Sequence, residues 1–168
     1  EPAGDRVPRL DDGLPGRLEM GLYGGPTPRR DSALNTETIV HECTHGFTHR
    51  RVGGGSGISW AAVQTRGMGE GWSDFFALSL LSQTNDNVNG CYAYGAYTAF
   101  LAIPGFQQNY YYGRRRYPYS TDMSKNPLTF KDIDPHQASA HAAVPISDDE
   151  KGDPEEVHNQ GEVWCMAL

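Results

Sequence analysis

Residues 38–51, TIVHECTHGFTHRR, constrain the fold of this chain more than any other stretch. Apolar residues recur along it at the spacing of one helix face and predict a buried stripe formed by Ile39, Val40, Cys43 and Phe47. The helix is expected to begin near Asp31 or Asn35 and to end near Arg50, because the glycines at 53–55 would destabilise a helix interior. The stretch therefore predicts one amphipathic helix that stops at the glycines.

The same helix carries two histidines four residues apart, His41 and His45, with Glu42 next to the first. Residues four apart lie on one helix face, so both imidazoles can point at a single metal ion. Glu42 projects about 100° round the helix from His41 and can reach a metal-bound water without being a ligand. A carboxylate in that place can take the proton of the water. Two solvated histidines on an exposed helix face are the alternative.

A third ligand is found in GMGEGWSDFF, residues 67–76. We expect a second helix from about Gly69 to Leu81, with Glu70 and Asp74 one turn apart on one face. A catalytic zinc site uses three protein ligands and leaves room for water. Glu70 suits the third ligand, and Asp74 suits a partner that accepts the outer N–H of a ligand histidine. Two solvated acids are the alternative, although the neighbouring aromatic residues predict a largely buried helix.

The remaining segments are less regular. Residues 17–24 predict an edge strand, and 91–103 are compatible with a third helix or a buried strand, of which we favour the helix. Residues 104–136 show little periodicity, and 157–168 predict a final helix. The acidic run 147–156 could hold Ca²⁺, but its spacing matches no EF-hand loop, and a solvated acidic turn is the alternative.

Length, charge and cysteine content exclude several classes of protein. A chain of 168 residues suits one domain, and a net charge of −7 argues against nucleic acid as a partner. No apolar run reaches the roughly 20 residues that span a bilayer. The three cysteines, Cys43, Cys91 and Cys165, allow one disulfide with a free thiol or three reduced thiols. Cys43 continues the apolar helix stripe, so we predict a small core residue rather than a metal ligand.

Together, HECTHG (41–46) and GMGEGWSDFF (67–76) resemble the fungalysin family of secreted zinc metalloendopeptidases, relatives of thermolysin. The similarity covers most of 18–168 and includes three further stretches, 29–42, 115–134 and 157–168. It implies an α+β fold that is mainly helical in this segment, that of a thermolysin-like zincin (gluzincin) catalytic domain. In this fold the active-site cleft lies between an N-terminal α/β part and a mainly helical C-terminal part.

The resemblance also implies an organisation of the chain. Residues 1–168 are expected to be a partial metallopeptidase catalytic domain, truncated at both ends. Residues 1–34 would be a remnant of the N-terminal lobe with its edge strand, and 35–82 the active-site helices. Residues 83–168 would form the cleft wall and the start of the helical C-terminal lobe.

The family pattern assigns roles to the residues already singled out. It implies His41, His45 and Glu70 as ligands of one catalytic zinc ion, with Glu42 as general base and proton shuttle and Asp74 behind a ligand histidine. These roles describe a zinc endopeptidase that acts on proteins or peptides. The alternative is a catalytically silent binding or structural domain of the same fold, with zinc as a staple. The resemblance further implies secretion and a pro-segment in the full-length protein.

Downstream, the family pattern implies that His158 faces the tetrahedral intermediate, where a protonated imidazole stabilises an oxyanion. An exposed loop histidine is the alternative. Asp153 stands at the offset from which an aspartate orients this histidine, and Glu155 and Glu156 compete for that role.

YYYGRRRYPYSTDM, residues 110–123, resembles part of the substrate-cleft wall, although its composition also suits a basic, aromatic surface loop. Arg116 is expected to donate a forked pair of hydrogen bonds to a substrate carbonyl, with Arg115 as the neighbouring alternative. An oxyanion-binding tyrosine, if the enzyme uses one, would be Tyr117, Tyr119 or another residue outside 46–69.

Overall fold

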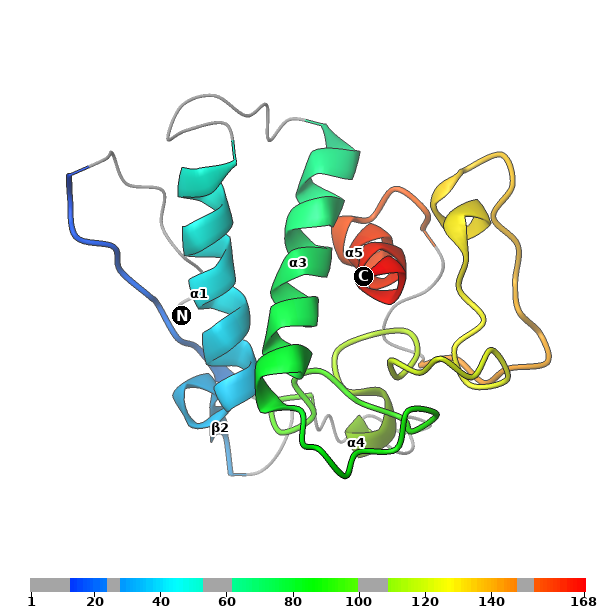
Figure 1. Cartoon of the computed structure of the whole chain (residues 1–168), viewed down its shortest axis with the longest axis horizontal. Helices are drawn as coiled ribbons and strands as arrows, with labels where there is room; N and C mark the ends of the chain where they lie inside the picture. The colour runs from blue at the N-terminus through cyan, green and yellow to red at the C-terminus, as the bar shows by residue number, and fades with distance from the viewer. Residues whose placement is uncertain (1–12, 24–27, 53–61, 100–108, 148–152) are drawn as a thin grey trace.

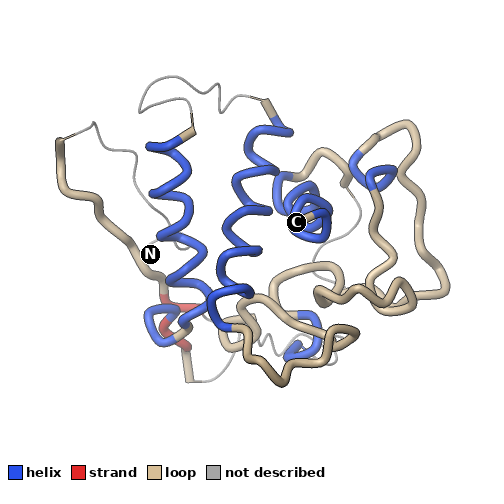
Figure 2. The backbone as a smooth tube through the Cα atoms, in the orientation of Figure 1, coloured by secondary structure: helices blue, strands red, loops and turns tan. Residues whose placement is uncertain are grey.

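The structure of the protein, a computed structural model, describes residues 13–23, 28–52, 62–99, 109–147 and 153–168. The described part is mainly helical (Figures 1 and 2). Its elements in chain order are β1 (Leu22–Tyr23), β2 (Arg30–Asp31), η1 (Ser32–Leu34), α1 (Thr36–Arg51), α3 (Val63–Leu81), α4 (Asn109–Tyr112), η2 (Phe130–Ile133) and α5 (Val157–Ala167).

Three helices organise the described part of the chain. Helices α1 and α3 lie side by side and run in opposite directions, and α5 packs against α3 on the side away from α1 (Figure 1). The expected edge strand is reduced to β1, which pairs antiparallel with β2 in the register Leu22–Asp31 and Tyr23–Arg30. In the described part of the chain, no helix has the length and apolar character needed to cross a membrane.

Helix α1 begins and ends close to where the sequence predicts. The side chain of Asn35 caps it by accepting the N–H of Thr38 at 3.3 Å, and acidic Glu37 in the first turn favours the positive end of the helix dipole. Its buried face, however, is not the predicted apolar stripe. Cys43 and Phe47 are exposed, Phe47 to 56%, so the prediction that Cys43 is a core residue is wrong.

The buried face of α1 is polar because it is the face that meets α3. It consists of Thr38, His41, Glu42, Thr44 and Thr48. A helix is expected to bury its apolar stripe, but here polar side chains are buried instead, and His41 among them is paired with Asp74 of α3 whereas Oγ1 of Thr38 makes no hydrogen bond within the described residues. The side chain of Thr44 donates to the Val40 carbonyl at 2.8 Å.

Helix α3 begins at Val63, ahead of the predicted start near Gly69. Glycines 67, 69 and 71 lower helix propensity, but tertiary packing requires small residues here. A Cβ added to Gly67 would lie 2.5 Å from Cβ of Gln160, and one added to Gly71 would lie 2.6 Å from Cβ of Trp164. Both partners belong to α5, so these glycines allow the two helices to pack closely.

The prediction of a helix over 91–103 is wrong for its described part, 91–99. Residues 91–94 bridge to other segments, with the N–H of Tyr92 donating to the Tyr119 carbonyl at 2.9 Å and the reverse bond at 2.8 Å. Residues 95–98 form a turn, in which the N–H of Thr98 donates to the Gly95 carbonyl at 3.1 Å. Residues 100–103 lie outside the described residues. Backbone groups of Tyr92 and Tyr94, which a helix would pair locally, are used here to attach 92–94 to the segment 113–119.

Helix α5 forms where the sequence predicts, with Glu156 as its cap, accepting the N–H of Asn159 at 2.9 Å. Around it, residues 113–147 are mostly loop (Figure 2). The apolar core contains a cluster of Ala77, Tyr94, Tyr119 and Cys165 and a second of Tyr117, Leu128 and Val163. All three cysteines are free thiols. Half of the acidic run proposed for Ca²⁺, residues 148–152 of 147–156, lies outside the described residues.

Candidate metal centre

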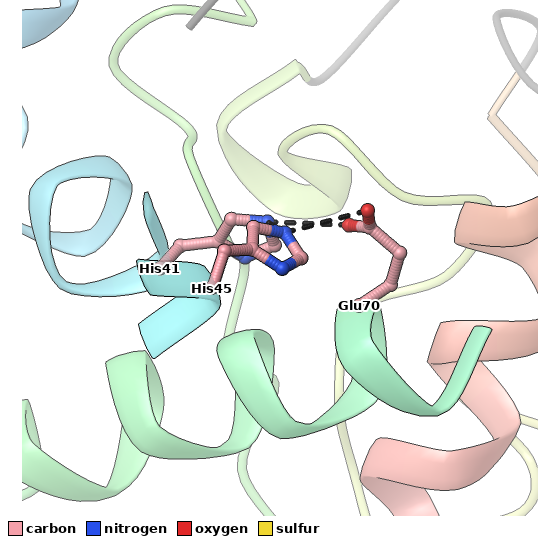
Figure 3. Close-up of side chains that lie close together, drawn as sticks. All are labelled: His41, His45 and Glu70. Atoms are coloured by element: carbon pink, nitrogen blue, oxygen red, sulfur yellow. Dashed lines mark hydrogen bonds and ion pairs between the residues drawn. The ribbon is translucent and has the colours of Figure 1, made fainter. Parts of the chain in front are cut away.

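Three side chains from α1 and α3 converge on one point. His41 and His45 project from the face of α1 towards Glu70 on the facing turn of α3 (Figure 3). The two Nε2 atoms are 3.0 Å apart, and they lie 3.2 Å and 3.4 Å from the carboxylate oxygens of Glu70. The structure thus brings together the three residues that the sequence predicts as ligands.

These separations fit a tetrahedral metal ion. With metal–ligand bonds of about 2.0–2.1 Å, two ligands of a tetrahedral zinc lie roughly 3.3 Å apart. Within the described residues, Oε2 of Glu70 is buried and makes no hydrogen bond, although His41 is close. A buried oxygen without a hydrogen bond is unfavourable, and a cation between the three donors would satisfy it.

The groups around His41 and Glu70 shift the pKa values of both side chains. Burial lowers the pKa of His41, but the hydrogen bond to Asp74 and the nearby carboxylates of Asp74 and Glu70 outweigh burial and raise the pKa to about 9. Burial alone would raise the pKa of Glu70, yet its contacts with His41 and His45 hold it well below its ordinary value. The centre therefore holds an ionised carboxylate that favours a positive charge beside it, as a cation site requires.

Asp74 connects the centre to the protein around it. Its Oδ1 lies 2.8 Å from Nδ1 of His41, and both its oxygens accept from Arg115, at 2.6 Å from Nε and 2.8 Å from Nη2. The hydroxyl of Tyr119 donates to the same carboxylate. Burial opposes ionisation of Asp74, but Arg115 and His41 outweigh it and hold its pKa below the ordinary range. Asp74 thus stands where the sequence predicts, behind Nδ1 of a candidate ligand.

The two residues predicted to act on substrate come from α1 and α5. Glu42 is buried next to His41 on α1. His158, at the start of α5, places Nε2 3.6 Å from Oε2 of Glu70, and 43% of its side chain remains exposed. Helices α1, α3 and α5 therefore contribute to one site, with His158 on the open side.

The structure gives Asp153 no contact with His158. Nδ1 of His158 lies 2.7 Å from Oε1 of Glu156, whereas Asp153 accepts the N–H of Glu155 at 2.9 Å. Glu156 is the helix cap, so its carboxylate already lies at the level of the first turn, where His158 can reach it. Glu156, and not Asp153 as expected, is therefore the acid that orients His158.

Arg116 is likewise turned away from the centre. Its Nε donates to Oε2 of Glu162 at 2.7 Å and its Nη2 to the carbonyl of Asn159 at 2.9 Å, and the residue is buried. The expectation that Arg116 binds substrate is not supported, because its guanidinium is already engaged in this internal pair. Its neighbour Arg115 lies at the centre instead, with Nη2 3.9 Å from Oε2 of Glu70.

Sequence reasoning missed Tyr94, whose ring stacks on His41 at a centroid distance of 4.7 Å. It lies 53 residues beyond His41 in CYAYGAY, a stretch interpreted there as a helix. Alternating tyrosines before a glycine were the available signal for an extended segment. Tyr117 and Tyr119, the tyrosines weighed for oxyanion binding, are both buried, 3% and 5% exposed, and Tyr119 is bonded to Asp74.

An HExxH helix whose histidines meet a glutamate of a second helix is the arrangement of a metallopeptidase centre. The model of the fungalysin metallopeptidase family (M36) matches residues 7–168, and the chain belongs to this family.

Named relatives agree with this assignment. The chain is 34% identical over 158 residues to a probable extracellular metalloproteinase 5 of Arthroderma benhamiae and to extracellular metalloproteinase 5 of Trichophyton rubrum. It is 35% identical to extracellular metalloproteinase 4 of Arthroderma otae. Each match covers 94% of the chain but only 20–21% of the relative, so the chain spans about a fifth of their length.

Proposed function

We propose that this chain carries the zinc centre and the general base of a metalloendopeptidase. His41, His45 and Glu70 would be the zinc ligands, and Glu42 the base. The observation that carries the proposal is the convergence of three donor atoms from two helices within 4.8 Å of one another. Family membership over residues 7–168 supports a metallopeptidase role.

A bound zinc ion would polarise the scissile carbonyl and lower the pKa of a bound water towards about 7. Within the chain, Glu42 would accept the proton of that water and pass it to the leaving amine. Its position on α1 suits this role, because the residue beside a ligand flanks the ion rather than binding it. Burial limits competition from bulk solvent for the same proton.

His158 would stabilise the negative charge that develops on the carbonyl oxygen. Its Nδ1 is engaged by Glu156 at 2.7 Å, so Nε2 is the nitrogen that faces the centre. Burial lowers the pKa of His158, but Glu156 outweighs it and raises the pKa above its ordinary value. A raised pKa favours the protonated imidazole that can donate to an oxyanion.

Two substitutions distinguish a zinc endopeptidase from a catalytically silent domain in which zinc is only structural. Glu42→Gln should retain zinc, measured by elemental analysis, and lose peptidase activity on casein by about 100-fold or more. Glu70→Ala should lose both zinc and activity. Zinc in the Glu42→Gln protein together with unchanged proteolysis would reject the mechanism, and no chelator-sensitive proteolysis in the wild type would favour the staple.

We extend the proposal to the protein as a whole. Relatives named extracellular metalloproteinases support secretion and protein substrates. A pro-segment, the thermolysin-like lobe arrangement and the division into 1–34, 35–82 and 83–168 stay predictions, as does the weaker suggestion of Ca²⁺. A zymogen form would be detected as a larger precursor whose processing switches on casein hydrolysis.

A further inference from the structure

Tyr94 lies with its ring against the imidazole of His41, on the core side of the centre. The ring centroids are 4.7 Å apart with an interplanar angle of 27°, a stacked arrangement. Tyr94 is 2% exposed and His41 3% exposed, so both rings are enclosed by protein. Offset-stacked rings at this separation attract each other. Tyr94 therefore presents a flat surface that opposes tilting of the imidazole.

His41 can act as a ligand in one ring orientation only, because its two nitrogens face different groups. Nδ1 lies 2.8 Å from Oδ1 of Asp74, and Nε2 lies 3.2 Å from Oε2 of Glu70. The bond to Asp74 fixes one point of the ring but leaves its tilt free. A second constraint on the ring face is required to direct Nε2 at the metal position, and the stacked ring of Tyr94 supplies it.

Arg115 holds Tyr94 and Asp74 together. The central carbon of its guanidinium lies 4.6 Å from the centroid of the Tyr94 ring, within cation–π distance. The same guanidinium makes two bonds to Asp74. The ring and the carboxylate, the two groups that orient His41, are thus tied to one buried cation.

The backbone of Tyr94 is fixed from the side of the 113–119 segment. Its carbonyl accepts the N–H of Arg114 at 2.8 Å, next to Gly113. Gly113 has φ of +63°, and a Cβ there would lie 2.1 Å from the Tyr94 carbonyl oxygen. Only glycine suits both the conformation and the close approach.

Gly95, the residue after Tyr94, is held by a side chain of helix α1. Oε2 of Glu37 accepts the N–H of Gly95 at 2.6 Å. Glu37 precedes His41 by four residues and therefore lies on the same face of the helix, one turn away. The helix that carries the candidate ligand thus also sets the place of the ring that stacks on it.

We propose that Tyr94 is a positioning residue for the metal centre, whose ring sets the tilt of the His41 imidazole. The inference rests on the proposed function, because it takes His41 as a zinc ligand. The proposed role belongs to the aromatic face of Tyr94 rather than to its hydroxyl. Substitutions that keep the ring and substitutions that remove it should therefore differ in zinc affinity.

The test is the zinc affinity of the purified protein, measured by competition with a chromophoric chelator. Tyr94→Leu should bind zinc about tenfold more weakly or worse, the scale on which partners of metal ligands act. Tyr94→Phe keeps the ring and should bind within about twofold of the wild type. Thermal unfolding with excess chelator shows whether either metal-free variant is folded.

A failed role for Tyr94 and a failed zinc site give different results in these measurements. Wild-type affinity in a folded Tyr94→Leu protein overturns the inference alone, and so does a Tyr94→Phe protein as weak as Tyr94→Leu. A wild-type protein that binds no zinc, or a Glu70→Ala protein that binds it normally, overturns the proposed function and this inference with it.

A measurement on the folded wild type covers the case in which Tyr94→Leu does not fold. In proton NMR of the zinc-loaded protein, ring protons of His41 should be shifted upfield by the stacked ring, and Tyr94→Phe should keep this shift. Tyr94→Met, which can fill the space without a flat ring, should lose the shift together with affinity. Absence of the upfield shift in the wild type overturns the proposal.

Discussion

Gly161 of α5 lies directly against Glu70 of α3: a Cβ added to Gly161 would stand 2.5 Å from Cβ of Glu70 and 3.0 Å from the nitrogen of Gly71. The third candidate ligand therefore rests on a neighbouring helix that has no side chain at the contact. The helix–helix distance that seats Glu70 depends on this glycine.

Gly161→Ala should accordingly weaken both the fold and the centre. The added methyl group meets backbone as well as side-chain atoms, so α3 and α5 must separate, and we expect a loss of about 1–3 kcal/mol in the free energy of unfolding. Zinc affinity should fall with it. Gly16→Ala is the matched control, because a Cβ there meets only Arg50 at ordinary contact distance, 3.6 Å. Equal melting temperatures for the two variants would contradict the close-packing argument.

Asp74→Asn should lower the affinity for zinc without leaving a cavity in the protein interior. The amide preserves shape but offers donors to Arg115, and it weakens the bond to Nδ1 of His41. We expect zinc binding to weaken by about 10- to 100-fold, read by chelator competition. Asp122→Asn serves as the control, since that carboxylate is bonded locally to Ser124. If Asp74→Asn bound zinc with wild-type affinity, Asp74 would not support the metal centre.

Arg116 should matter to stability rather than to substrate binding. It forms a buried pair with Glu162, and removing one partner leaves an uncompensated buried charge, which costs about 3–5 kcal/mol. Glu162→Gln should therefore lower the melting temperature strongly, and Arg116→Met combined with Glu162→Leu should recover part of the loss. If Arg116→Met instead raised KM with unchanged stability, the guanidinium would have to reach substrate.

His158 predicts the direction of a pH effect on proteolysis. Glu156 raises the pKa of His158 against the opposing effect of burial. If the protonated imidazole is the active form, activity is present below this raised pKa and is lost as pH rises through it. Glu156→Gln removes the charge, lowers the pKa and should move the alkaline limb of kcat/KM to lower pH. Glu155→Gln is the neighbouring control, and an alkaline limb that stays in place in both variants would exclude His158 as its source.

The helix that bears the histidines and the place of Glu70 on a second helix could be predicted from local rules. Spacing of four residues puts His41 and His45 on one face whatever surrounds the helix, because the period of the α-helix is the same everywhere. The final helix was also predicted, over 157–168, and the structure has it at Val157–Ala167.

Other features followed from contacts between segments far apart in the chain. The face of α1 that becomes buried was mistaken, because apolar Cys43 and Phe47 are exposed while polar Thr38 and His41 meet α3. Periodicity identifies an apolar stripe, but it does not reveal that His41 on the polar stripe meets the buried carboxylates of Asp74 and Glu70. Early entry into α3 was missed for a related reason, since glycines that weaken an isolated helix are required where α5 approaches.

Residue types and their spacing were thus sufficient to select the three candidate ligands that the structure brings together, because both are properties of a single helical turn or of two short motifs. Which arginine reaches the centre, which acid engages His158 and which tyrosine stacks on His41 were decided by packing. Arg115 and Arg116 are adjacent in a bend, yet Arg115 meets Asp74 while Arg116 meets Glu162. The direction each side chain takes depends on helices that arrive from elsewhere in the chain.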